Sequence, residues 1–179
     1  KTIKDISTNI APPAREGAWL AGGPDFGIFK EPATTKLEKA GHAHVLKSVG
    51  KEVGRAENTV LFANKSWLSA NRASAQKLTN AIAKAQAWMA KASEDDVAKA
   101  MASYFPGIPL EDSAGVIKRY RATGAPVYSE STVIPRDGLA KLQEVMVEGG
   151  ILPATKVVPY EAIVVTDIPM EALRRLAAN

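Results

Sequence analysis

The sequence predicts an α/β protein in which strands and helices alternate at first and helices dominate afterwards. Over residues 1–57, short apolar or β-branched runs alternate with helix-type segments through short connections. This order is typical of a parallel sheet covered by helices. From residue 71 onward, apolar residues recur at the spacing of amphipathic helices. With 179 residues, of which 46% are hydrophobic, the chain is long enough to bury a core.

Proline and glycine residues delimit the elements expected within residues 1–57. Pro12-Pro13 can open a helix, since proline tolerates the first helical turn, and Gly22-Gly23 would end it. Glu31-Pro32 precedes a second helical pattern, which Gly41 would end. The expected order is strand 2–9, helix 15–20, strand 26–29, helix 33–40 and strand 44–46.

The second part of the chain is predicted to be mainly helical. A polar segment with two glycines, 49–58, is interpreted as a linker, and 59–63 as one further strand. Ser93 with Asp96 has the form of a capping box and predicts a helix start. The expected helices are 71–92, 93–105, 110–123, 135–148 and 169–178.

Composition and charge exclude several classes of protein. The chain has no cysteine, which excludes disulfides, thiol catalysis and thiolate metal sites. No apolar run approaches the length of about 20 residues that a membrane-spanning helix needs. The net charge is +4 and the basic residues are scattered, so no nucleic-acid partner is expected. The densest basic group, 118–121, is interpreted as a solvated helix face.

Catalytic and metal-binding signals are weak. His42 and His44 would share one face of a strand, but no third metal ligand is suitably spaced, so a solvated turn is favoured. Nucleophile-elbow, phosphate-loop, dinucleotide and zinc-protease motifs are all missing. The three carboxylates of 94–96 would complement a helix dipole. The sequence therefore favours a protein that binds a ligand over an enzyme, and indicates neither cofactor nor metal.

Two strand–helix junctions are candidate binding sites, because ligands of open α/β sheets lie where strands end and helices begin. The first junction is 9–13. At the second, Phe29, Lys30 and Glu31 follow one another before Pro32, so that an aromatic ring, a cation and a carboxylate emerge together. The alternative is a polar turn with Phe29 in the core.

A family resemblance rests on this second junction. The stretch from Gly23 to Pro32 resembles the Gly-x-Ile-Asp-Ala-x-x-x-x-Glu-Pro signature of ABC-transporter substrate-binding proteins of the nitrate/sulfonate/taurine type. That group also contains binders of the thiamine pyrimidine precursor. Pro24 and Phe26 depart from the signature, and Phe29 stands where tryptophan is common. Further segments that resemble the family are 73–92, 104–107, 120–121, 142–150 and 157–161.

The resemblance implies a periplasmic-binding-protein type II-like, two-lobed α/β fold, of which this chain would be a helix-rich C-terminal part. Residues 1–57 would belong to lobe 2. Residues 58–179 would contribute the crossover strand and the helical part of lobe 1. Since these helices would lack most of their sheet, self-association is expected. The implied location is the periplasm or the cell exterior, with membrane anchoring through a missing N-terminal lipid signal as an open alternative.

The implied function is that of a receptor that binds a small nitrate-, sulfonate-, taurine- or pyrimidine-like solute by hinge closure and delivers it to a membrane permease. Carried over by residue, Phe29 would stack on a planar solute and Glu31 would accept its hydrogen bonds. Asn58 and Thr59 would contact it at the hinge, and Asn9 is a weaker candidate. The alternatives are an enzyme of thiamine-pyrimidine synthesis and a ligand-sensing regulatory domain of the same fold.

Overall fold

The computed structural model describes residues 10–53, 59–122 and 131–178, and these residues form an all-helical structure. They contain ten α-helices and two 3₁₀ turns but no strand, so the α/β prediction is wrong. The helices are α2 (Pro12–Leu20), α3 (Ala33–Lys39), α4 (Val49–Val53), α5 (Lys65–Ala70), α6 (Arg72–Met89), α7 (Glu94–Met101), α8 (Leu110–Ala122), α9 (Arg136–Glu148), α10 (Tyr160–Ile163) and α11 (Asp167–Ala177). The 3₁₀ turns are Ala102–Tyr104 and Ala154–Lys156.

The segments predicted as strands are irregular because none of them has a neighbouring strand. Residues 26–29, 44–46 and 59–63 carry no regular structure, and no described backbone hydrogen bond joins any two of them. A strand is stable only when its amide and carbonyl groups pair with a second extended segment. Apolar sequence alone therefore did not produce a sheet here. The remaining predicted strand, 2–9, lies outside the described residues.

Most of the predicted helices are confirmed, and their ends lie where the sequence signals placed them. Helix α2 begins with proline in its first turn, and α3 is followed by Gly41 at φ 72°. The Ser93 hydroxyl accepts a hydrogen bond from the Asp96 N–H and caps α7. Three short helices were not predicted. Helix α4 falls within the expected linker, and α5 and α10 lie in segments for which no element was predicted.

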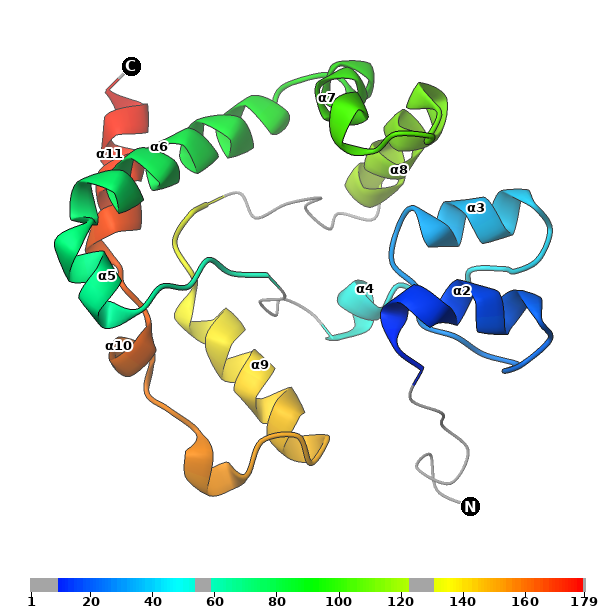
Figure 1. Cartoon of the computed structure of the whole chain (residues 1–179), viewed down its shortest axis with the longest axis horizontal. Coiled ribbons are helices and arrows are strands. Elements are labelled where there is room, and N and C mark those ends of the chain that lie inside the picture. Colours follow the sequence, from blue (N-terminus) through cyan, green and yellow to red (C-terminus); the bar gives the residue numbers. More distant parts are fainter. Residues whose placement is uncertain (1–9, 54–58, 123–130, 179) are drawn as a thin grey trace.

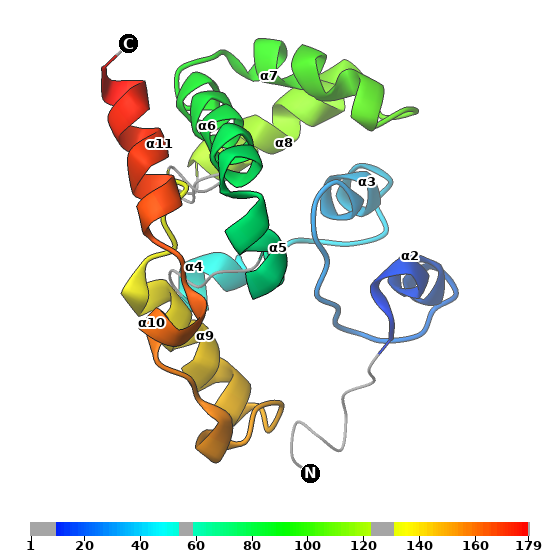
Figure 2. The same cartoon turned by 60° about the vertical axis from the view of Figure 1, so that its left-hand side comes forward.

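Several helices pack in pairs (Figure 1). Helix α11 lies along α6, where the Gln76 side-chain amide donates to the Ile168 carbonyl at 3.0 Å. Helix α7 packs on α8 through a core of Val97, Ala98 and Ile117. The second view shows α2 and α3 as a pair on the side away from α11 (Figure 2).

Large apolar side chains are exposed along much of the described chain, and ten of them lie between residues 20 and 67. Phe62 is 94% exposed and Phe26 is 77% exposed. The others in this range are Leu20, Ile28, Val45, Leu46, Val49, Val60, Leu61 and Trp67. Such a surface is typical of a protein that makes further contacts. Of the helices that the structure describes, none is both long and apolar enough to cross a bilayer.

Candidate functional site

Phe29 is packed against Trp19 of α2. The two ring centroids are 5.5 Å apart and the rings are nearly perpendicular, at 87°. The Trp19 indole N–H donates to the His42 carbonyl at 2.9 Å, which fixes the tryptophan ring. Gly27 lies close to both rings: an added Cβ would be 2.5 Å from the Phe29 ring and 3.2 Å from the Trp19 ring, so a side chain at this position would displace them. Phe29 is half-buried, and its stacking role stays a prediction.

Glu31 faces α8. Its Oε2 accepts a hydrogen bond from the Thr35 backbone N–H at 3.0 Å, one turn into α3. Its Oε1 lies 3.7 Å from Nη1 of Arg119. The side chain is only 10% exposed, so the carboxylate is held between the start of α3 and a guanidinium. A carboxylate at a helix start also complements the helix dipole.

Arg119 bonds a second carboxylate of the same segment. Its Nη2 donates to Oε2 of Glu38 at 2.6 Å. This hydrogen bond is the main cause that lowers the pKa of Glu38 below its ordinary value of 4.5; the Val45 N–H and the positive charges of Arg119 and His44 act in the same direction, against desolvation. One guanidinium therefore holds two carboxylates from segments about 80 residues away in sequence.

A second ion pair joins the same helices. Lys39, the last residue of α3, donates to Asp112 in the first turn of α8. This hydrogen bond raises the pKa of Lys39 above 10.5, and the negative charges of Asp112 and Glu111 add to the effect, against desolvation. We call Glu31, Glu38, Lys39, Asp112 and Arg119 the α3–α8 charge cluster.

Of the other predicted site residues, Thr59 is the one that lies among the described residues. Thr59 is exposed, and no described residue is hydrogen-bonded to it. Asn9 and Asn58 lie outside the described residues. Sequence reasoning missed Arg119, because it lies in the basic group interpreted as a solvated face. That interpretation is corrected for Arg119, and also for Arg121, which bonds Glu94 at 2.6 Å and the carbonyls of 89 and 92.

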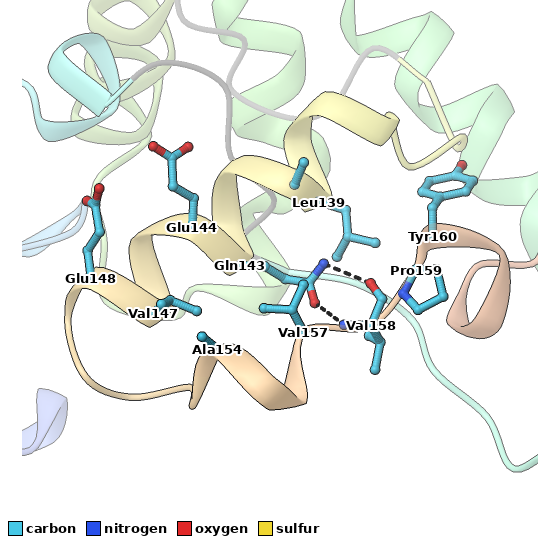
Figure 3. Close-up of a pocket in the computed structure, with 11 residues that line it drawn as sticks. Leu139, Gln143, Glu144, Val147, Glu148, Ala154, Val157, Val158, Pro159 and Tyr160 are labelled. Carbon is cyan, nitrogen blue, oxygen red and sulfur yellow. Dashed lines mark hydrogen bonds between the residues drawn. The ribbon is translucent and has the colours of Figure 1, made fainter.

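A cavity of about 510 Å³ lies between α9 and the segment that leads into α10 (Figure 3). Its lining residues are Leu139, Ala140, Gln143, Glu144, Val147, Glu148, Ala154, Val157, Val158, Pro159 and Tyr160. Both ends of the Gln143 amide are hydrogen-bonded: Nε2 donates to the Val158 carbonyl at 3.1 Å and Oε1 accepts from the Val158 N–H at 2.9 Å. The cavity volume is in the range of small-molecule sites, but none of Phe29, Glu31 and Thr59, the predicted site residues that the structure describes, lines it.

Metal binding finds no support in the part of the chain that the structure describes. No group of three or more histidine, aspartate or glutamate side chains is arranged to hold an ion there. His42 and His44 lie on an irregular segment, not on a strand, so the geometry that would have paired them on one face is missing.

Comparison with known proteins relates the chain to a binding protein. It is 30% identical over 164 residues to a protein of Bacillus subtilis (strain 168) that carries the name Putative binding protein YtlA. The match includes 92% of this chain and 48% of the relative, so the chain spans about half the length of the curated relative it matches. No known protein-family profile matches the chain, and no solved structure matches it.

The name of the relative describes binding and mentions no reaction. It agrees with the balance of the sequence evidence, which favoured a ligand-binding protein over an enzyme. The solute, the transport role and the membrane partner are not specified by that name.

Proposed function

We propose that the chain is part of a solute-binding receptor of an ABC importer, which binds a small solute by hinge closure without catalysis. The observation that carries the proposal is the similarity to a binding protein over nearly the whole chain. The Gly23–Pro32 signature supports it independently, since it resembles transport receptors for nitrate, sulfonates, taurine and pyrimidines. In this proposal residues 1–57 belong to one lobe and 58–179 to the other, and the receptor works in the periplasm or at the cell exterior, where it delivers its solute to a permease.

The α3–α8 charge cluster supports Glu31 as the polar contact of the solute. Its carboxylate is a hydrogen-bond acceptor, and the Arg119 guanidinium, whose Nη1 lies 3.7 Å from Glu31 Oε1, adds donors beside it. Aminosulfonates carry both charges and aminopyrimidines offer amino donors and ring-nitrogen acceptors, whereas nitrate is only an anion. The arrangement therefore favours solutes with a donor group and an acceptor group over a simple anion.

The test is calorimetric titration of the whole chain with taurine, an alkanesulfonate, nitrate and an aminopyrimidine. We expect one of these probes to bind, and Glu31→Gln to weaken that binding at least tenfold. Glu16→Gln is the matched control, because Glu16 pairs with Lys36 on the exposed side of the same helical pair. If Glu31→Gln and Glu16→Gln bind alike, Glu31 is not the contact; if no probe binds, the solute class is wrong.

Self-association is a separate part of the proposal. It rests on the exposed apolar side chains between residues 20 and 67, because an apolar surface of this kind is stabilised by contact with another surface. Light scattering after gel filtration measures the mass directly. A mass of one chain at micromolar concentration would contradict it, and a mass of two or more chains that falls for Phe62→Ser would support it.

A further inference from the structure

The polar side-chain contacts described between α3 and α8 all join charged groups, while Thr35 and Leu37 of α3 are buried. The apolar core of α8 is formed with α7: Val97, Ala98 and Ile117 are its buried members, and the partly buried side chains around it come from Met89, Ala92, Met101 and Ala114. Residues 10–53 contribute none of these side chains. Three ion pairs of the α3–α8 charge cluster join this part of the chain to α8.

We propose that Arg119 is a positioning residue for Glu31 and that, together with the Lys39–Asp112 pair, it forms a charged clasp that docks α2 and α3 onto α8. The role of Glu31 toward a solute rests on the proposed function, whereas the docking does not. The clasp determines whether the Glu31 carboxylate faces α8 or turns into solvent.

The chemistry of arginine explains why one residue can hold both carboxylates. A guanidinium has five N–H donors in a rigid plane, so Nη1 can face Glu31 while Nη2 bonds Glu38. A lysine at this position has the charge but not the two-sided geometry. Without a cation, the two carboxylates lie near one another with no neutralising charge, and both favour separation of α3 from α8.

The ion pairs between α3 and α8 can open and re-form. Contacts between parts of a chain that are small and polar allow relative motion, unlike contacts with a large apolar core. Exposed ion pairs are weakened by salt, since the Debye length falls to about 3 Å at 1 M ionic strength. The side chains of Lys39 and Arg119 are 57% and 39% exposed, so salt has access to the clasp.

The experiment is hydrogen–deuterium exchange of the whole chain, without solute, read in peptides that cover residues 33–42. We expect Arg119→Gln to exchange about five- to tenfold faster there than the parent, as for the loss of ion pairs of modest strength. The exchange rate of Arg119→Lys in these peptides should lie between those of the parent and Arg119→Gln. The matched control is Lys118→Gln, which removes the same charge from an exposed neighbour on α8; we expect it to exchange like the parent.

Reversal of the charges of the Lys39–Asp112 pair distinguishes loss of docking from loss of folding. Lys39→Asp and Asp112→Lys should each increase exchange in residues 33–42, and the double variant should restore slow exchange because the pair is re-formed with opposite polarity. Circular dichroism of each variant checks that total helix content is unchanged. Addition of 1 M NaCl should raise the exchange rate of the parent in residues 33–42 close to that of Arg119→Gln.

Two results would overturn the clasp: equal exchange of Arg119→Gln and Lys118→Gln, or a double charge reversal that exchanges as fast as the single variants. Either result leaves the solute titrations unaffected. Conversely, a chain that binds none of the probes but shows the expected exchange pattern contradicts the proposed function and supports the clasp.

Discussion

Truncation of Ile117 is the sharpest test of the packing of α7 on α8. The side chain is 5% exposed and lies with Val97 and Ala98 at the centre of the core. Ile117→Ala removes three carbon groups, worth about 2.4 kcal/mol at about 0.8 kcal/mol each. An unfilled cavity adds to this loss and the better helix propensity of alanine returns a few tenths, so we expect destabilisation of about 3 kcal/mol.

Two further variants test whether the loss in stability follows the number of carbon groups removed and the burial of the side chain. Ile117→Val removes one carbon group and should cost about 1 kcal/mol. Leu110→Ala also removes three carbon groups from α8, but Leu110 is 46% exposed. Only about half of the transfer energy of the side chain is therefore lost in Leu110→Ala, and little cavity forms. We expect the free energy of unfolding to fall by about 1 kcal/mol.

The assay is urea unfolding followed by far-ultraviolet circular dichroism, with one transition required before a free energy of unfolding is extracted. The expected order of destabilisation is Ile117→Ala, then Ile117→Val and Leu110→Ala together. An Ile117→Ala variant within about 0.5 kcal/mol of the parent, or less destabilised than Leu110→Ala, would refute the described core, because a side chain that packs on nothing loses little when it is shortened.

Three other outcomes are expected. Gln143→Glu replaces the amide donor that bonds the Val158 carbonyl with an acceptor, and should lower the free energy of unfolding by about 1 kcal/mol in urea; no loss would contradict the paired hydrogen bonds. Ser93→Ala should cost about 1 kcal/mol and Ser93→Gly only a few tenths, since both remove the α7 cap but glycine is tolerated there; equal costs would argue against a capping role. Because the hydrogen bond from Arg119 lowers the pKa of Glu38 below 4.5, the stability that Glu38 contributes is complete above pH 4.5 and is lost as the pH falls through the lowered value. Exchange in residues 33–42, corrected for intrinsic rates, should therefore rise more steeply on acidification in the parent than in Glu38→Gln, which keeps only the ion pairs of Glu31 and Asp112.

Helix positions could be predicted from the sequence because their signals are local. Proline at 12 and 13, the Ser93 cap and the positive φ of Gly41 act within one or two turns of the helix that they start or end. The amphipathic spacing of α6 to α9 and α11 needs no knowledge of the partner. The short helices α4, α5 and α10 were missed because four to six residues carry too little periodicity.

The candidate site was predictable only in part. The Gly23–Pro32 resemblance pointed to Phe29 and Glu31, and the structure places Glu31 in a charged contact. Its partner Arg119 lies 88 positions further along the chain, and the local pattern of 118–121 resembles an ordinary solvated helix face. No spacing rule connects residues this far apart, so Arg119 and Glu38 could not be named as partners beforehand.

The sequence by itself determined where most helices start and stop, since caps, proline and glycine act on neighbouring backbone groups. Only the tertiary structure decided that residues 26–29, 44–46 and 59–63 do not form a sheet, because a strand depends on hydrogen bonds to another segment. It also decided that Arg119 meets Glu31 and Glu38. The reason is the same in both cases: pairing between distant segments is a property of their arrangement in space and is not encoded in either segment alone.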